Sequence, residues 1–109
     1  MNEKIAELKG LCREWTKEHT QVLAEKILNT YSDVVKAVEV DAGLTDNDTK
    51  EFYEALANHA LSMSQSETQR DVKAVLEFIH DWSLTLSDVE GGKYPAFDYD
   101  GLVNCFFWL

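Results

Sequence analysis

The chain has 109 residues, of which 45% are hydrophobic and one is proline, and this composition excludes a disordered or low-complexity chain. Twenty acidic residues against ten basic ones give a net charge of −10, which excludes direct binding to nucleic acids or anionic membranes, because like charges repel. The surplus is uneven: residues 1–26 hold five acids and five bases, whereas the rest of the chain holds 15 acids and five bases. Any partner selected by charge should therefore be a basic protein.

The sequence gives no sign of secretion or of a membrane anchor. Two cysteines are too few for a disulfide framework, and the N-terminus lacks the apolar core of a secretory signal. The longest nearly unbroken apolar run, 102–109, is far shorter than the roughly 20 residues that span a bilayer. We therefore expect a cytoplasmic protein.

Residues 3–30 are expected to form one long helix, because apolar residues recur every three or four positions between charged ones. The main stripe comprises Ile5, Leu8, Cys12, Trp15, His19 and Val22, and a second line comprises Leu11, Leu23, Ile27 and Tyr31. Residues 29–33 have weak helix propensity and predict either a kink or a break before a short helix over 34–38. Gly43 is suited to ending that helix.

The next helix is predicted over 46–63, with Thr45 or Asp48 as its N-cap and a polar loop at 62–66 after it. The longest amphipathic pattern covers 66–89, where Ser66 and Gln69 resemble a capping box and two glycines follow at 91–92. We expect this helix to be central and to be covered by the helices over 3–30 and 46–63.

The C-terminal part is predicted to be irregular and then helical. Residues 93–101 combine turn residues with three aromatics, which either cover the core or bind a partner. Residues 102–109 favour a short helix in the core, the alternative being an apolar patch covered by a second copy or a partner. The predicted fold class is all-α: a single-domain bundle of four or five helices with a short C-terminal apolar helix, residues 1–109 forming one acidic helical domain.

No motif predicts catalysis or a bound cofactor. Glu77 and His80 have the spacing of one half of a carboxylate-bridged di-iron site, but the second such motif is missing. The stretch from Asp46 departs from a calcium loop at Glu51 and Ala57, and no two cysteines or histidines stand at zinc spacing. Nucleophile-elbow, phosphate-loop and dinucleotide motifs are also missing from the sequence. We therefore expect a protein that is not an enzyme and has no cofactor or metal.

The acidic residues concentrate in two stretches. The first, 39–54, holds six acids against one base at a junction between helices, and the second surrounds the end of the central helix and the aromatic segment. Aromatic and charged residues in mixture are typical of the centres of protein interfaces, although high charge also simply keeps a domain soluble. The candidate partner-binding residues are Glu39, Asp41, Asp46, Asp48, Glu51, Glu54, Asp88, Glu90, Tyr94, Asp98, Tyr99 and Asp100.

These patterns suggest an acidic inhibitor that covers the basic surface of a nucleic-acid-handling partner, as a toxin immunity protein or a nucleic-acid mimic does. Its carboxylates would stand in for phosphates, so that binding would weaken steeply with salt. The alternative is a structural or adaptor subunit that self-associates, for example as a homodimer, through the stripe of the first helix or the terminal aromatics.

Overall fold

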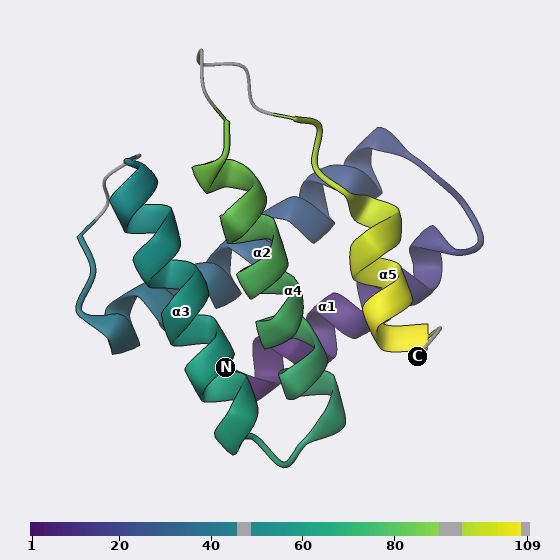
Figure 1. The fold of residues 1–109 in the computed structure, drawn as a ribbon. Helices are drawn as coiled ribbons and strands as arrows, with labels where there is room; N and C mark the ends of the chain where they lie inside the picture. The colour runs from purple at the N-terminus through teal and green to yellow at the C-terminus, as the bar shows by residue number, and fades with distance from the viewer. Residues whose placement is uncertain (46–48, 90–94, 108–109) are drawn as a thin grey trace.

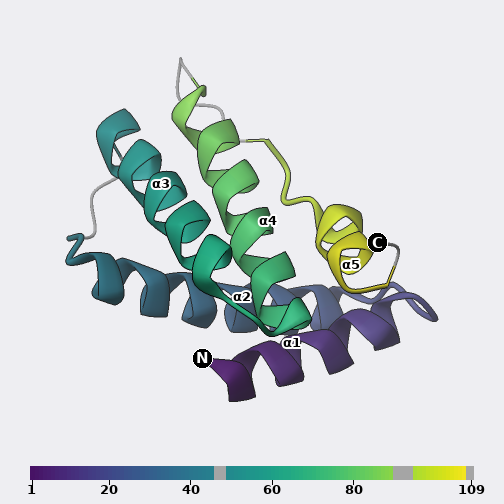
Figure 2. The ribbon, with the colours of Figure 1, turned by 60° about the horizontal axis from the view of Figure 1, so that its bottom comes forward.

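The computed structural model describes residues 1–45, 49–89 and 95–107, which form five helices and no strand. The helices are α1 (Asn2–Trp15), α2 (Gln21–Ala42), α3 (Lys50–Ser66), α4 (Arg70–Ser87) and α5 (Tyr99–Phe107). Two views show two layers: α1 and α2 lie side by side, and α3, α4 and α5 pack across them (Figure 1, Figure 2). The predicted all-α bundle is confirmed, and so is its short C-terminal apolar helix.

The central element is α4, which buries more side chains than any other described helix and packs against α3, α5 and α1. Its large buried apolar residues are Val72, Val75, Leu76, Phe78 and Ile79. Burying each of these side chains stabilises the fold by about 1.5–3 kcal/mol relative to leaving it exposed. The helix α4 therefore forms the centre of the core. All five helices contribute to one hydrophobic cluster around it.

The helix predicted over 3–30 is in fact two helices, and this prediction is wrong. The chain turns between Trp15 and Gln21, where the Thr20 hydroxyl caps α2 by accepting the Leu23 backbone N–H at 3.1 Å. The turn lets α1 pack against α2, so that Leu8 and Ile27 both become fully buried. The apolar spacing continues across the turn, but the residues on its two sides do not lie on one buried face. Val22, at the start of α2, is 63% exposed.

The break that was one of the two predictions for 29–33, with a separate short helix over 34–38, does not occur, because α2 runs through this segment without interruption. Thr30, Tyr31 and Val34 are buried in the core, and this tertiary burial outweighs the weak helix propensity of the segment. The predicted end of the helix is confirmed at Ala42. Gly43 follows it in the left-handed conformation at φ 69°.

The boundary between α3 and α4 also differs from the prediction. Residues 62–66 are helical rather than a loop, because the small Ser64 is buried and its hydroxyl donates to the Leu61 carbonyl at 2.7 Å. The N-cap of α3 is Thr49, whose hydroxyl accepts the Phe52 N–H at 3.1 Å. The helix predicted from 66 begins at Arg70 instead, after a connection of three residues that makes α3 and α4 an antiparallel hairpin.

The irregular segment 95–98 covers the core, through Phe97. The Phe97 ring lies within 6 Å, centroid to centroid, of the rings of Tyr31, Phe78, Trp82 and Tyr99. Such aromatic pairs add about 0.5–1.5 kcal/mol each beyond the area that they bury. The segment is therefore fixed against α2 and α4.

Candidate functional site

The first predicted acidic stretch lies at the adjoining ends of α2 and α3. Asp41 Oδ2 is 2.8 Å from His59 Nε2, and Glu54 Oε1 is 4.0 Å from Lys50 Nζ. Glu51 is exposed in the first turn of α3, whereas Glu39 is only half-buried on α2. Asp46 and Asp48 lie outside the described residues.

The second predicted set divides between binding candidates and structural residues. Asp98 caps α5, because its carboxylate accepts the Gly101 backbone N–H at 2.8 Å. Asp100 accepts the Trp15 indole N–H at 3.3 Å, and the half-buried Tyr99 ring stacks on the same indole at 5.0 Å. Asp88 is exposed directly after α4.

These contacts give Asp98, Tyr99 and Asp100 a role within the fold. Glu90 and Tyr94, the remaining predicted members of this set, lie outside the described residues.

Two further carboxylates belong to the same surface: Asp81, which is part of the second acidic stretch of the sequence, and Glu77, which is not. Glu77 and Asp81 stand one helical turn apart on α4, and both are exposed. Burial, together with the negative charges of Asp81, Glu77 and Asp98, raises the pKa of the Cys105 thiol on α5 to about 11. All three carboxylates therefore lie near enough to Cys105 to act on the charge of its thiol. The spacing of Glu77 and Asp81, one turn apart on a predicted helix, could be recognised from the sequence.

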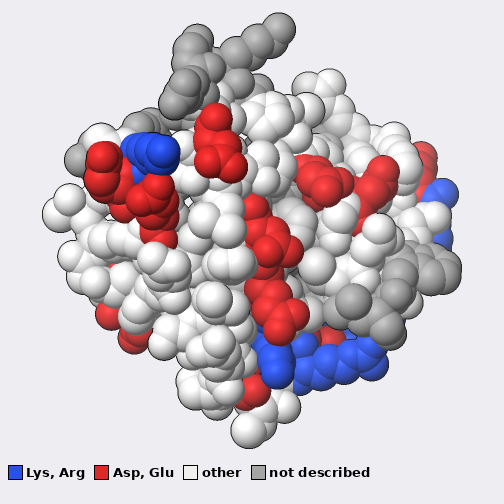
Figure 3. All heavy atoms as spheres, viewed as in Figure 1, with Lys and Arg blue, Asp and Glu red and all other residues white. Residues whose placement is uncertain are grey.

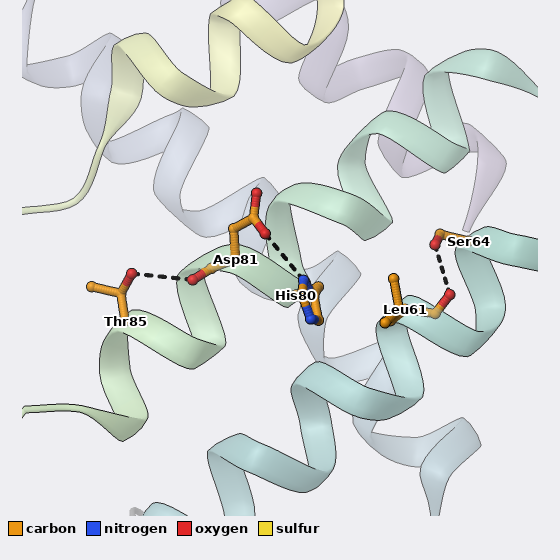
Figure 4. A network of polar contacts seen from close by, with 5 residues as sticks. All are labelled: Leu61, Ser64, His80, Asp81 and Thr85. Carbon is orange, nitrogen blue, oxygen red and sulfur yellow. Dashed lines mark hydrogen bonds and ion pairs between the residues drawn. The ribbon is translucent and has the colours of Figure 1, made fainter.

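The polar contacts on this side of α4 are local. The Asp81 carboxylate turns toward His80 with an Oδ1 to Nδ1 distance of 3.0 Å, and the Thr85 hydroxyl donates to the Asp81 backbone carbonyl at 3.1 Å (Figure 4). Within the described residues, no group of three or more His, Cys, Asp and Glu is arranged to hold a metal ion. Among the described helices, none is both long and apolar enough to cross a membrane.

The acidic side chains on the face formed by α3, α4 and α5 make a broken band rather than one compact patch. Figure 3 shows acidic groups in a line down the middle of this face, over α4, with others over the upper end of α3 and beside α5. Uncharged atoms separate these groups, and the few basic side chains lie mostly toward the edges. A partner would have to cover several helices to meet all of these carboxylates.

The lysines of α1 pair with acids of other helices. Lys4 Nζ lies 3.3 Å from Asp33 Oδ2 on α2, and Lys9 Nζ lies 3.0 Å from Asp71 Oδ2 on α4. These pairs join the neutral N-terminal helix to the acidic remainder of the chain. Asp33 and Asp71 are therefore not among the acids at the C-terminal ends of α2 and α4, because each lies more than one helical turn before the end of its helix.

A cleft of 290 Å³ opens between α2, α3, α4 and the segment 95–98. Its aromatic lining residues come from all four elements: Tyr31, Phe52, Tyr53, Trp82 and Phe97. Among the described residues that line the cleft, the charged ones are Lys36 and Glu39, both on α2. Of the predicted site residues that the structure describes, Glu39 alone lines it. Sequence patterns do not reveal this cleft because its walls come from segments far apart in the chain.

Comparisons with protein-family models, with curated proteins and with solved structures found no match to this chain.

Proposed function

We propose that this chain is a non-enzymatic binding protein that inhibits a basic, nucleic-acid-handling protein in the cytoplasm by covering its nucleic-acid-binding surface. Carboxylates on α2, α3 and α4 would pair with the lysines and arginines that otherwise hold phosphates. The partner surface would have to be broad, because the acidic band extends over several helices.

The observation that carries the proposal is the placement of acids at the negative ends of helices. The C-terminal end of a helix carries a partial negative charge, and cations there are favourable by about 0.3–1 kcal/mol. Neither α2 nor α4 has a base in its last turn. Instead, Glu39 and Asp41 stand in the last turn of α2, and Asp88 follows α4.

Acids at these positions interact unfavourably with the partial negative charge of a helix C-terminus, and a cationic partner would offset that interaction. Local rules of helix design are broken most often at functional sites. In the neutral α1, by contrast, the last turn holds Arg13 beside Glu14, so that a base accompanies the acid. Of these three helices, the two whose C-terminal ends have acids and no base, α2 and α4, belong to the part of the chain that carries the net charge.

The test begins with capture of partners from the native host by the immobilised chain, at low and at high salt. The proposal predicts a basic protein that is retained at low salt and released at high salt. The purified partner is then bound to labelled nucleic acid, and the chain is added in increasing amounts. Displacement of the nucleic acid supports inhibition by occlusion, whereas a ternary complex of all three would contradict it.

The alternative, self-association through the first-helix stripe, would have to use its exposed members, His19 and Val22. Ile5, Leu8 and Cys12 are buried within the chain by the other helices, and Trp15 is half-buried. Of the terminal aromatics, Phe106 is buried.

A further inference from the structure

The cleft between α2, α3, α4 and the segment 95–98 has the size of a pocket for one side chain. Its volume is 290 Å³, whereas sites for drug-sized ligands begin at about 300 Å³. Of its aromatic lining residues, Tyr53 and Trp82 are half-buried and so retain exposed ring surface, and Leu28 beside them is 38% exposed. Aromatic residues around a small pocket are typical of the energetic centres of protein interfaces.

The walls of the cleft favour an occupant that is neither charged nor polar. Among the described lining residues the charged ones, Lys36 and Glu39, have opposite signs, so that their charges cancel. No buried side-chain nitrogen or oxygen of the described residues lacks a hydrogen-bond partner, so none of them requires a polar occupant. A buried tyrosine or tryptophan would bring a polar group that needs a partner of its own, whereas a phenylalanine ring only packs against the rings around it.

The cleft lies among the acids on which the proposed function rests. Glu39 is itself a lining residue, and Glu54 directly follows the lining residue Tyr53. Asp88, which is exposed, stands two positions after the lining residue Leu86. A basic partner drawn to these acids would therefore cover the cleft, and protein interfaces commonly have such an apolar centre within a charged rim.

We propose that this cleft receives a phenylalanine side chain of the basic partner, with lysines or arginines next to it in the partner drawn to the surrounding acids. This inference rests on the proposed function and adds to it the uncharged residue that anchors the partner. It predicts a contribution to binding that charge attraction does not give and that salt does not screen.

The test compares two synthetic heptapeptides of equal charge as ligands of the full chain, each with three lysines on both sides of either phenylalanine or serine. Dissociation constants are measured at several salt concentrations, and the indole N–H signal of Trp82 is followed by NMR. The phenylalanine peptide is expected to bind about tenfold more tightly and to be the one that shifts the Trp82 signal. The ratio of the two dissociation constants should stay constant as salt rises, because salt screens the lysines that both peptides share.

A matched pair of variants tests where the ring binds. Ser32 is an exposed lining residue of the cleft, so Ser32→Phe adds a ring there without changing the charge, and the tenfold preference should fall to about onefold. Ser62→Phe adds the same ring at an exposed position of α3 that does not line the cleft, and it should leave the preference at about tenfold.

Equal binding of both peptides to the wild type would overturn the phenylalanine pocket and leave the proposed function standing. A preference that survives Ser32→Phe as fully as it survives Ser62→Phe would overturn it too, because the ring would then bind elsewhere. Failure of both peptides to bind at low salt would count against the proposed function itself. Movement of the Trp82 signal on concentrating the protein alone would show that a second copy fills the cleft, and would likewise overturn the inference.

Discussion

The cap of α5 gives the sharpest test of the structural role assigned to Asp98. Its carboxylate accepts the Gly101 N–H at 2.8 Å, and a Cβ added to Gly101 would collide with that same carboxylate. Gly10, in the middle of α1, has nothing within 4 Å of the position that a Cβ would occupy. The two helical glycines should therefore respond in opposite ways to the same substitution.

Gly10→Ala is expected to stabilise the fold by about 0.5–1 kcal/mol through helix propensity. Gly101→Ala gains a similar amount but displaces the Asp98 cap, which is worth about 1 kcal/mol, so its net effect is zero or destabilising. Asp98→Ala alone should cost about 1 kcal/mol. Gly101→Ala made in the Asp98→Ala background should stabilise by about 0.5–1 kcal/mol, because the collision has gone.

Urea unfolding followed by circular dichroism measures all four free energies of unfolding, and unchanged m-values show that the unfolding reaction is the same. The coupling between the two positions should be about 1 kcal/mol. If Gly101→Ala stabilises the wild type as much as Gly10→Ala does, the assignment of Asp98 as a cap is wrong. Asp98 would then return to the candidate binding residues.

Four further predictions rest on the fold. Thr20→Ala should cost about 1 kcal/mol in urea unfolding, because it removes the cap that starts α2, and an unchanged stability would mean that the cap is unimportant. Phe97→Ala should cost about 2–3 kcal/mol, because four rings lose their common neighbour, and a loss below about 0.5 kcal/mol would contradict its role as a cover of the core. Burial raises the pKa of Cys12 to about 12 and that of Cys105 to about 11, so alkylation of the native protein at pH 8 should be at least about 100-fold slower than in urea. Because the unfolded thiols lose their protons first, stability should fall as the pH rises from about 9 through 11, and a flat pH profile there would contradict the shifts.

The sequence was sufficient for the fold class, because it depends on long periodic segments. The pattern from Val72 to Leu86 predicts the central helix, and Gly43 predicts the end of α2. Helix boundaries were predicted less well, since they depend on single contacts. The Thr20 cap divides a stripe that looks continuous, and the burial of Ser64 extends α3 through a stretch that resembles a loop.

The candidate site was predictable as a charge excess but not as a shape. Composition identifies the acids, yet their roles differ: Asp98 caps a helix, while Asp88 is exposed after one. The cleft between α2, α3 and α4 combines residues as distant as Tyr31 and Phe97, and no short-range pattern links such positions. Tertiary structure is needed to bring them together.

The central claim is that carboxylates downstream of α1 bind a basic partner, and a matched pair of charge reversals tests it most directly. One variant carries Glu51→Lys, Glu54→Lys and Asp88→Lys, at the end of the α3–α4 hairpin where α3 begins and α4 ends. The control carries Glu3→Lys, Glu14→Lys and Glu25→Lys in the neutral N-terminal segment, so that both variants change the net charge equally.

The decisive measurement is the dissociation constant of the captured partner for the wild type and both variants at low salt. The first variant should bind at least about tenfold more weakly, and the control within about threefold of the wild type. Equal weakening by both variants, or by neither, would contradict the account.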